Sequence, residues 1–209
     1  MLNILNKFEL IKPIMQAEGP LNSSDRPKLL DVGCRGCELM PYVNDICSYE
    51  GADLFQNDKG TVTHVLDVSE GLPFDDNSFD FVVALDLVEH LDDFKAALED
   101  LVRVSKTTII MLPNLAHAAF RWKFLRTGTI CGKYDLRYGQ GQDRHRWLTV
   151  LDQCDEYMED FAQDHKLNLS SHWFYDSNKK KRFAQICRLF GIKPQFWIWS
   201  SYYVLTKSV

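Results

Sequence analysis

The chain has 209 residues, of which 45% are hydrophobic and 25% are charged, and its formal net charge is −5. These values are typical of a globular protein that can bury a full core. They exclude a disordered chain, a collagen-like chain and a coiled coil. No apolar run reaches the roughly 18 residues that a transmembrane helix requires, so we expect no membrane span.

The six cysteines are few and scattered for a chain of this length, which argues against a disulfide framework. Charged residues at positions 7, 9 and 12 interrupt the apolar N-terminal stretch, which is not typical of a signal peptide. We therefore predict a cytoplasmic protein. Cys34 and Cys37 form a C-x-x-C pair, which leaves a thioredoxin-like role open, whereas a zinc site would require a second pair.

Charge is divided unevenly along the chain. Residues 1–115 contain 9 basic and 20 acidic residues, whereas residues 116–209 contain 15 basic and 9 acidic residues. Affinity for nucleic acid depends on the neutralisation of phosphates, so an overall acidic chain is a poor general nucleic-acid binder. We expect a small molecule as the binding partner of a monomer or a homodimer.

Alternating strand-like and helical patterns predict an α/β fold. Near the N-terminus, apolar residues at helical spacing predict a helix disturbed by Pro13, and residues 19–27 read as a connector. Strand-like runs follow at residues 28–32, 46–54, 62–68 and 79–83. Residues 94–101 then fit a helix capped by Asp92 or Asp93, and residues 107–112 fit a buried strand.

The C-terminal part differs in pattern but fits the far side of the same sheet. Thr149-x-x-Asp152 resembles a capping box that begins a helix. A strand over 167–175, a helix ended by Gly191 and an aromatic strand over 195–206 complete the chain. We predict that its aromatic residues pack in the core, with a dimer through this strand as the alternative. Residues 1–209 thus form one domain, with an N-terminal helix and connector over 1–27 and an irregular insert over 114–148.

The most informative stretch is the sequence LLDVGCRGCEL at residues 29–39, in which a strand enters a glycine turn and then a helix. Glycine permits such a turn and lets a ligand approach the backbone. Asp53 stands 22 residues after Asp31, where a carboxylate can accept hydrogen bonds from both ribose hydroxyls. Asp67 ends the third run, where it can bond an adenine amine. Carboxylates at three successive strand ends predict a nucleoside site.

Several longer blocks of the sequence resemble the class I S-adenosyl-L-methionine-dependent methyltransferases, and among them the small-molecule group called type 11. The blocks are DVGC at 31–34, GLPFDDNSFD at 71–80, DLVEHL at 86–91, LVRVS at 101–105 and LPN at 112–114. The resemblance covers residues 28–114. It implies a Rossmann-like, seven-stranded, mostly parallel sheet with a reversed last strand and helices on both faces. It also implies methyl transfer from S-adenosylmethionine held over the carboxyl edge of the sheet.

The resemblance places the cofactor against the ends of the first four strands. The residues concerned are Asp31, Gly33, Cys34, Arg35, Gly36, Asp53, Leu54, Asp67, Val68, Leu85 and Asp86. In the family the loop usually reads D-x-G-x-G-x-G, but Arg35 and Cys37 stand at the second and third glycine positions here. The side chain at position 35 either crowds the cofactor or points outward. The connection over 105–107 lacks the family's glycine-rich turn, which predicts a tight junction.

The insert over 114–148 is expected to cover the crevice and to select the substrate. Its net charge of +5 suits an anionic sugar or metabolite that accepts the methyl group on a hydroxyl or carboxyl. Its candidate residues are His145 or His117 as the base, and Arg121, Tyr134 and Arg144 as substrate contacts. The alternative is a solvated lid whose arginines pair with the acidic N-terminal half.

Three other functions fit parts of the sequence. A non-catalytic protein that keeps the fold fits the altered glycine loop. A nicotinamide-dependent oxidoreductase requires G-x-G-x-x-G, which Arg35 breaks. A nucleic-acid methyltransferase would show an Asn/Asp-Pro-Pro-aromatic motif or a Pro-Cys nucleophile, and neither occurs. No cluster of histidine and carboxylate with ligand spacing stands out, so we predict no metal site.

Overall fold

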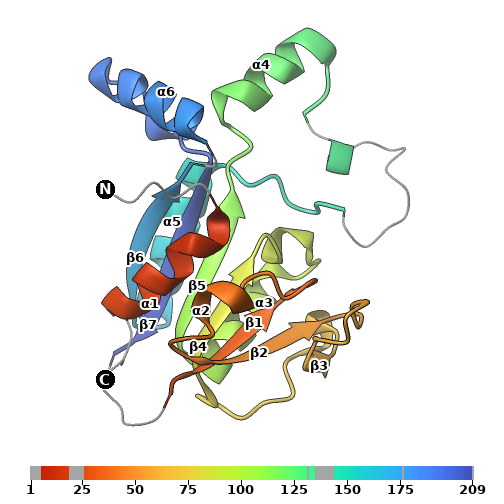
Figure 1. Ribbon diagram of the computed structural model, residues 1–209. Helices are drawn as coiled ribbons and strands as arrows, with labels where there is room; N and C mark the ends of the chain where they lie inside the picture. Colours follow the sequence, from red (N-terminus) through yellow and green to blue (C-terminus); the bar gives the residue numbers. More distant parts are fainter. Residues whose placement is uncertain (1–5, 19–25, 131, 135–143, 176, 209) are drawn as a thin grey trace.

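The computed structural model describes residues 6–18, 26–130, 132–134, 144–175 and 177–208 (Figure 1). Within them, seven strands form one sheet in the order β3-β2-β1-β4-β5-β7-β6. The strands are β1 (Lys28–Val32), β2 (Ser48–Asp53), β3 (His64–Val65), β4 (Phe79–Leu85), β5 (Ser105–Pro113), β6 (Leu167–Phe174) and β7 (Ser200–Lys207). β7 runs antiparallel to both of its neighbours, and all other pairs are parallel. The predicted sheet with a reversed last strand is confirmed.

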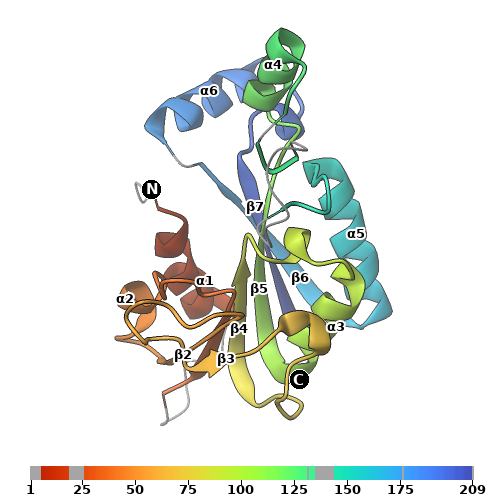
Figure 2. The same ribbon diagram turned by 90° about the vertical axis from the view of Figure 1, so that its right-hand side faces the viewer.

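Helices cover both faces of the sheet. Figure 2 shows α1 and α2 on one side of the sheet and α3 and α5 on the other. The α-helices are α1 (Ile11–Glu18), α2 (Met40–Val43), α3 (Phe94–Val104), α4 (Ala118–Thr127), α5 (Leu151–Asp164) and α6 (Asn178–Leu189). Short 3₁₀ helices are η1 (Lys7–Leu10), η2 (Val68–Glu70), η3 (Val88–His90), η4 (Gly132–Tyr134) and η5 (Pro194–Phe196). The part of the chain that the structure describes has no helix with the length and apolar character needed to cross a membrane.

Two buried clusters hold these layers together. Leu98 of α3 and Met158 of α5 pack on one face of the sheet, and Ile14 of α1 and Val43 of α2 pack on the other. All four side chains are at most 2% exposed. The central strands are therefore apolar on both faces, which explains their almost continuous hydrophobic sequence.

The N-terminal half follows the predicted order with shorter elements. Pro13 does not disturb α1, because it stands in the first turn, where a backbone amide has no partner inside the helix. The helix predicted after the glycine turn is only the four-residue α2, and the strand predicted over 62–68 is reduced to β3. Asp93 caps α3 by accepting a hydrogen bond from the amide of Ala96 at 2.9 Å.

Two connections show how the sequence specifies the path of the chain. Ser105 ends α3 and begins β5, so the predicted tight junction is confirmed. The predicted capping box before α5 is wrong, because Val150 is the N-cap residue and contributes no side-chain bond. The hydroxyl of Thr149 instead donates to the carbonyl oxygen of Pro113 at 2.7 Å, which ties the start of α5 to the end of β5.

The insert contains a helix, α4, that the sequence reading did not predict. Both figures show α4 and α6 projecting together beyond one end of the sheet. They carry exposed apolar side chains, among them Leu125 and Leu189 at 76% and 84% exposure. The aromatic Tyr202 and Tyr203 of β7 are buried, as predicted. A dimer through β7 is excluded, because this strand lies inside the sheet between β5 and β6 and has no free edge.

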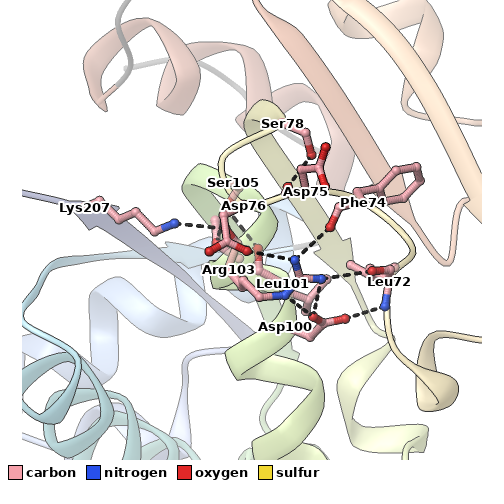
Figure 3. Close-up of polar contacts among 11 residues, drawn as sticks. Leu72, Phe74, Asp75, Asp76, Ser78, Asp100, Leu101, Arg103, Ser105 and Lys207 are labelled. Atoms are coloured by element: carbon pink, nitrogen blue, oxygen red, sulfur yellow. Dashed lines mark hydrogen bonds and ion pairs between the residues drawn. The ribbon is translucent and has the colours of Figure 1, made fainter.

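One side chain, Arg103 of α3, holds the loop that leads into β4 (Figure 3). Its Nη2 donates to the carbonyl oxygen of Leu72 at 2.9 Å, and its Nη1 donates to that of Phe74 at 2.7 Å. It also forms ion pairs with Asp76 and with Asp100, and Asp100 accepts the backbone amide of Leu72. Much of the block GLPFDDNSFD therefore builds this loop rather than binding a ligand.

We expect Arg103→Ala to destabilise the protein, because the substitution leaves two carbonyl oxygens of the loop without their donors. The free energy of unfolding, measured with urea, should fall by about 1–3 kcal/mol. Lys95→Ala on the same helix is the control. The Lys95 ammonium is exposed and lies 3.8 Å from Glu99, so its loss should change stability by less than about 0.5 kcal/mol. Equal effects of the two substitutions would contradict the role of Arg103.

Candidate functional site

Two adjoining hollows lie at the carboxyl ends of β1, β2, β3 and β4. The larger has a volume of about 490 Å³ and the smaller about 170 Å³. Gly33, Arg35 and Asp86 line both, so the hollows meet where β1 and β4 end. In an open α/β sheet this edge is the place where ligands bind.

The larger hollow combines carboxylates with apolar walls. Asp53, at the end of β2, accepts a hydrogen bond from the backbone amide of Arg35 at 2.8 Å. Asp67 caps η2 with one oxygen, which accepts from the amide and the hydroxyl of Ser69 at 2.9 and 2.6 Å. Leu54 and Leu66 are among the apolar residues beside them. This combination suits a nucleoside, whose hydroxyls need acceptors and whose base needs apolar surfaces.

The loop after β1 adopts the conformation of a glycine-rich loop although two glycines are replaced. Gly33, Arg35 and Cys37 have φ angles of 76°, 47° and 54°. Only glycine adopts this left-handed region without cost, so Arg35 and Cys37 each cost roughly 1–2 kcal/mol. A Cβ at position 33 would lie 3.0 Å from Cδ1 of Leu87. A side chain at position 33 would therefore crowd Leu87, which follows β4.

The C-x-x-C pair is packed into the protein. The Sγ atoms of Cys34 and Cys37 lie 3.6 Å apart, and both residues are buried. Gly51 of β2 allows this packing, because a Cβ there would lie 2.9 Å from the Cys34 sulfur. Burial raises the pKa of the Cys34 thiol, which disfavours the reactive thiolate. These properties argue against a thioredoxin-like role.

Asp31 is a buried acid at the floor of the smaller hollow. It is 5% exposed, and one of its oxygens accepts a hydrogen bond from the Tyr49 hydroxyl at 2.7 Å. Burial raises the pKa of Asp31 to about 7, although the bond from Tyr49 opposes this shift. The carboxyl group thus changes its charge near neutral pH.

Two further acids follow the end of β4. Asp86 has a positive φ of 54°, and its carboxylate pairs with the Lys7 ammonium at 2.8 Å. Glu89, in η3, is fully buried, and neither of its carboxylate oxygens has a hydrogen-bond partner among the described residues. Burial, helped by the charge of Asp86, raises the pKa of Glu89 to about 8, while Lys133 and Lys7 oppose the shift.

The structure gathers the predicted cofactor residues with one exception. All of them line one or both hollows except Gly36. A Cβ at position 36 would meet the carboxylate of Glu38, 2.9 Å away. The contact of the other residues with a cofactor stays a prediction.

The two candidate bases lie in different places. His145 lines the smaller hollow. His117 instead caps α4, where its Nδ1 accepts a hydrogen bond from the amide of Ala119 at 3.0 Å, and its ring packs against Trp199. His117 lines neither hollow, and its described contacts are those of a helix cap.

The predicted substrate contacts are likewise separated. Arg121 donates to the carbonyl oxygen of Ala116 at 2.6 Å and lies over the ring of Phe196, away from both hollows. The ring of Tyr134 lies 5.4 Å from that of His145, beside the smaller hollow. Arg144 is exposed and lines neither hollow. Residues 135–143 of the insert lie outside the described residues.

The sequence reading missed a convergence of three side chains. Glu89, His90 and His145 each offer one metal-ligand atom, and these atoms lie within 4.8 Å of one another. The adjacent Glu89 and His90 are visible in the block DLVEHL, but nothing in the sequence pairs them with a histidine 55 positions later. The prediction of no metal site therefore overlooked a group of suitable chemistry.

Comparisons with solved structures define the class of fold. A S-adenosylmethionine-dependent methyltransferase from Archaeoglobus fulgidus superposes with a TM-score of 0.58 at 17% identity, covering 97% of this chain and 95% of the other. Magnesium protoporphyrin IX methyltransferase from Synechocystis PCC 6803 superposes with a TM-score of 0.57 at 12% identity, covering 96% of this chain and 81% of the other. The methyltransferase domain of a bacterial Hen1 gives 0.61 at 12% identity, covering 97% of both. The fold is that of the class I S-adenosylmethionine-dependent methyltransferases.

A family model places the chain more narrowly within this class. Residues 23–189 match the model of the methionine biosynthesis protein MetW. The chain therefore belongs to the MetW family. No curated protein matches the sequence.

We expect the stability of the ligand-free protein to fall as pH rises from about 4 to 7, because of Asp31. Its ordinary pKa is 3.8, so between these values the unfolded state is ionised while the folded state keeps the proton. Each pH unit in this interval then costs up to about 1.4 kcal/mol. When the free energy of unfolding is measured with urea at several pH values, Asp31→Asn should remove the part of its decrease with pH that comes from Asp31. Asp58→Asn, in an exposed loop, should retain it, and an unchanged slope in Asp31→Asn would contradict the assignment.

Proposed function

We propose that this chain binds S-adenosylmethionine across the two hollows and transfers the methyl group to a small-molecule acceptor. The observation that carries the proposal is the row of carboxylates at one edge of the sheet. Asp31, Asp53, Asp67 and Asp86 belong to or follow β1, β2, β3 and β4 in turn, and all four line the hollows. The solved Synechocystis enzyme of the same fold has S-adenosylhomocysteine bound, which supports the choice of ligand.

The chain's own residues fit this ligand. Asp53 would accept hydrogen bonds from the ribose hydroxyls, and Asp67 from the adenine amine, between the apolar walls of the larger hollow. Gly33 lines both hollows, and its backbone can pass close to Leu87 because it carries no side chain. Asp86 would hold the ammonium group. When bound, S-adenosylmethionine supplies a methyl group on a positively charged sulfur, which retains the bonding electrons as the acceptor's lone pair takes the methyl.

The smaller hollow is our proposed place for the acceptor. Its volume of about 170 Å³ admits a small group, and Lys7, Lys133 and His145 contribute cationic or titratable side chains to its wall. Of the two histidines predicted as the base, His145 lines this hollow and His117 does not, so we assign the contact with the acceptor to His145. The lysines suit an acceptor with an anionic group nearby.

A non-catalytic protein that retains the fold is the second candidate, and one contact favours it. The Lys7 ammonium pairs with Asp86 at 2.8 Å, where the ammonium group of the ligand would bind. If this pair persists, it competes with the ligand. Lys7→Met should then raise the affinity for S-adenosylhomocysteine in calorimetric titrations, because it frees Asp86. An affinity that falls instead would show that Lys7 helps to hold the ligand.

The proposed cofactor site is tested by calorimetric titration with S-adenosylhomocysteine. We expect saturable binding to the wild-type chain, and a loss of about tenfold or more in Asp53→Ala, because hydrogen bonds to a charged group contribute about 1.5–3 kcal/mol. Asp58→Ala, which removes a nearby exposed carboxylate that lines neither hollow, should bind like wild type. Failure of the folded wild-type chain to bind would contradict the proposal.

A further inference from the structure

The Glu89–His90–His145 cluster is the part of the site that nucleoside binding leaves unexplained. Glu89 and His90 belong to η3 after β4, whereas His145 lies near the end of the insert over 114–148. Backbone hydrogen bonds join the two segments: the amides of Arg146 and Trp147 donate to the carbonyl oxygen of Glu89 at 3.0 and 3.3 Å. The main chain therefore holds the three side chains together without depending on their own contacts.

The carboxylate of Glu89 needs a compensating charge in this position. Its side chain is fully buried, and in the described part of the chain neither oxygen receives a hydrogen bond. Burial of an ionised carboxylate without a partner is strongly unfavourable, so the group either keeps its proton or binds a cation. The nearby Lys7 ammonium is directed to Asp86 and does not donate to Glu89.

The histidine rings are arranged in a way that suits metal ligation. Nδ1 of His90 lies 3.2 Å from the carbonyl oxygen of Arg144. A carbonyl oxygen only accepts, so Nδ1 carries a proton, and when the ring is neutral its lone pair lies on Nε2. A ligating histidine characteristically donates its second nitrogen to such a carbonyl. The rings of His90 and His145 lie 4.6 Å apart, edge to face, so both reach the same space.

We propose that Glu89, His90 and His145 bind one divalent transition-metal ion. Two imidazoles with one carboxylate favour ions such as Mn²⁺, Co²⁺ or Zn²⁺ over Ca²⁺, which prefers oxygen ligands throughout. His90 lines the larger hollow, and Glu89 and His145 line the smaller one, so the ion would lie where the hollows meet. Three protein ligands leave coordination positions open for another molecule.

The position of the ion identifies the acceptor class, an inference that rests on the proposed function. An open coordination position beside the smaller hollow suits an oxygen of the acceptor. An ion held there would lower the pKa of a coordinated hydroxyl, so that its proton would pass to water and its oxygen would keep the electron pair. The acceptor would therefore be a small molecule that is methylated on a hydroxyl, and His145 would contact it through the metal.

The test uses the full chain after treatment with EDTA, titrated with Mn²⁺ while electron paramagnetic resonance measures the free ion. Mn²⁺ is chosen because it has little preference for the thiols of Cys34 and Cys37. We expect one bound Mn²⁺ per chain, and an affinity at least about tenfold lower in Glu89→Gln and in His145→Asn. Circular dichroism checks that each variant is folded.

A matched control comes from a second pair of the same chemistry. Glu50 and His64 lie 2.7 Å apart on β2 and β3, away from the cluster, so Glu50→Gln should leave Mn²⁺ binding unchanged. Lack of saturable binding by the wild-type chain up to roughly 1 mM Mn²⁺, or an equal loss in Glu50→Gln, would overturn the proposal. If Glu89→Gln does not fold, His145→Asn decides the outcome.

The metal site and the methyl-donor site can fail separately. Mn²⁺ binding without S-adenosylhomocysteine binding would retain the metal site and overturn the proposed function. S-adenosylhomocysteine binding without Mn²⁺ binding would overturn the metal site alone.

Discussion

The parallel pairing of β1 with both β2 and β4 determines where the functional side chains of this protein lie. Asp31 of β1 is in register with Gly51 of β2 and with Val83 of β4. The three strands therefore end at nearly the same level, and the loops after them meet above one edge of the sheet. The helices on both faces make this arrangement rigid, because the strands between them are buried on both sides.

This convergence concentrates acidic groups in a small volume, and the surrounding structure balances them by different means. Asp53 accepts a hydrogen bond from a backbone amide, Asp31 accepts one from the Tyr49 hydroxyl, and Asp86 forms an ion pair with the Lys7 ammonium. The carboxylate oxygens of Glu89 have no such contact within the described chain, and Glu89 is the least exposed of these acids. The raised pKa values of Asp31 and Glu89 follow from this crowding and burial.

Local patterns in the sequence were sufficient to predict most of the strands and the acids at their ends, whereas the seven-stranded sheet with its reversed last strand followed from the resemblance to the methyltransferases. Each strand and the acid at its end can be recognised from a few neighbouring residues, as in the apolar runs that end at Asp53 and Asp67. The roles of Arg103 and His145 were not accessible in this way, because each depends on a contact between distant segments. Arg103 donates to the backbone carbonyl oxygens of Leu72 and Phe74, and because every residue has such a group, the residue types do not reveal the contact. His117 and His145 look alike in sequence, and only the path of the insert separates a helix cap from a residue of the hollow.

The position of β7 between β5 and β6 has a consequence for the growing chain. β6 pairs only with β7 in this sheet, and β5 is separated from the same strand by residues 114–199. During synthesis both strands therefore leave the ribosome with an open edge, and the α5 face of the sheet cannot close until residues 200–207 emerge. Open strand edges favour association between chains. The strand order therefore leaves the edges of β5 and β6 available for pairing with another chain until β7 has been made.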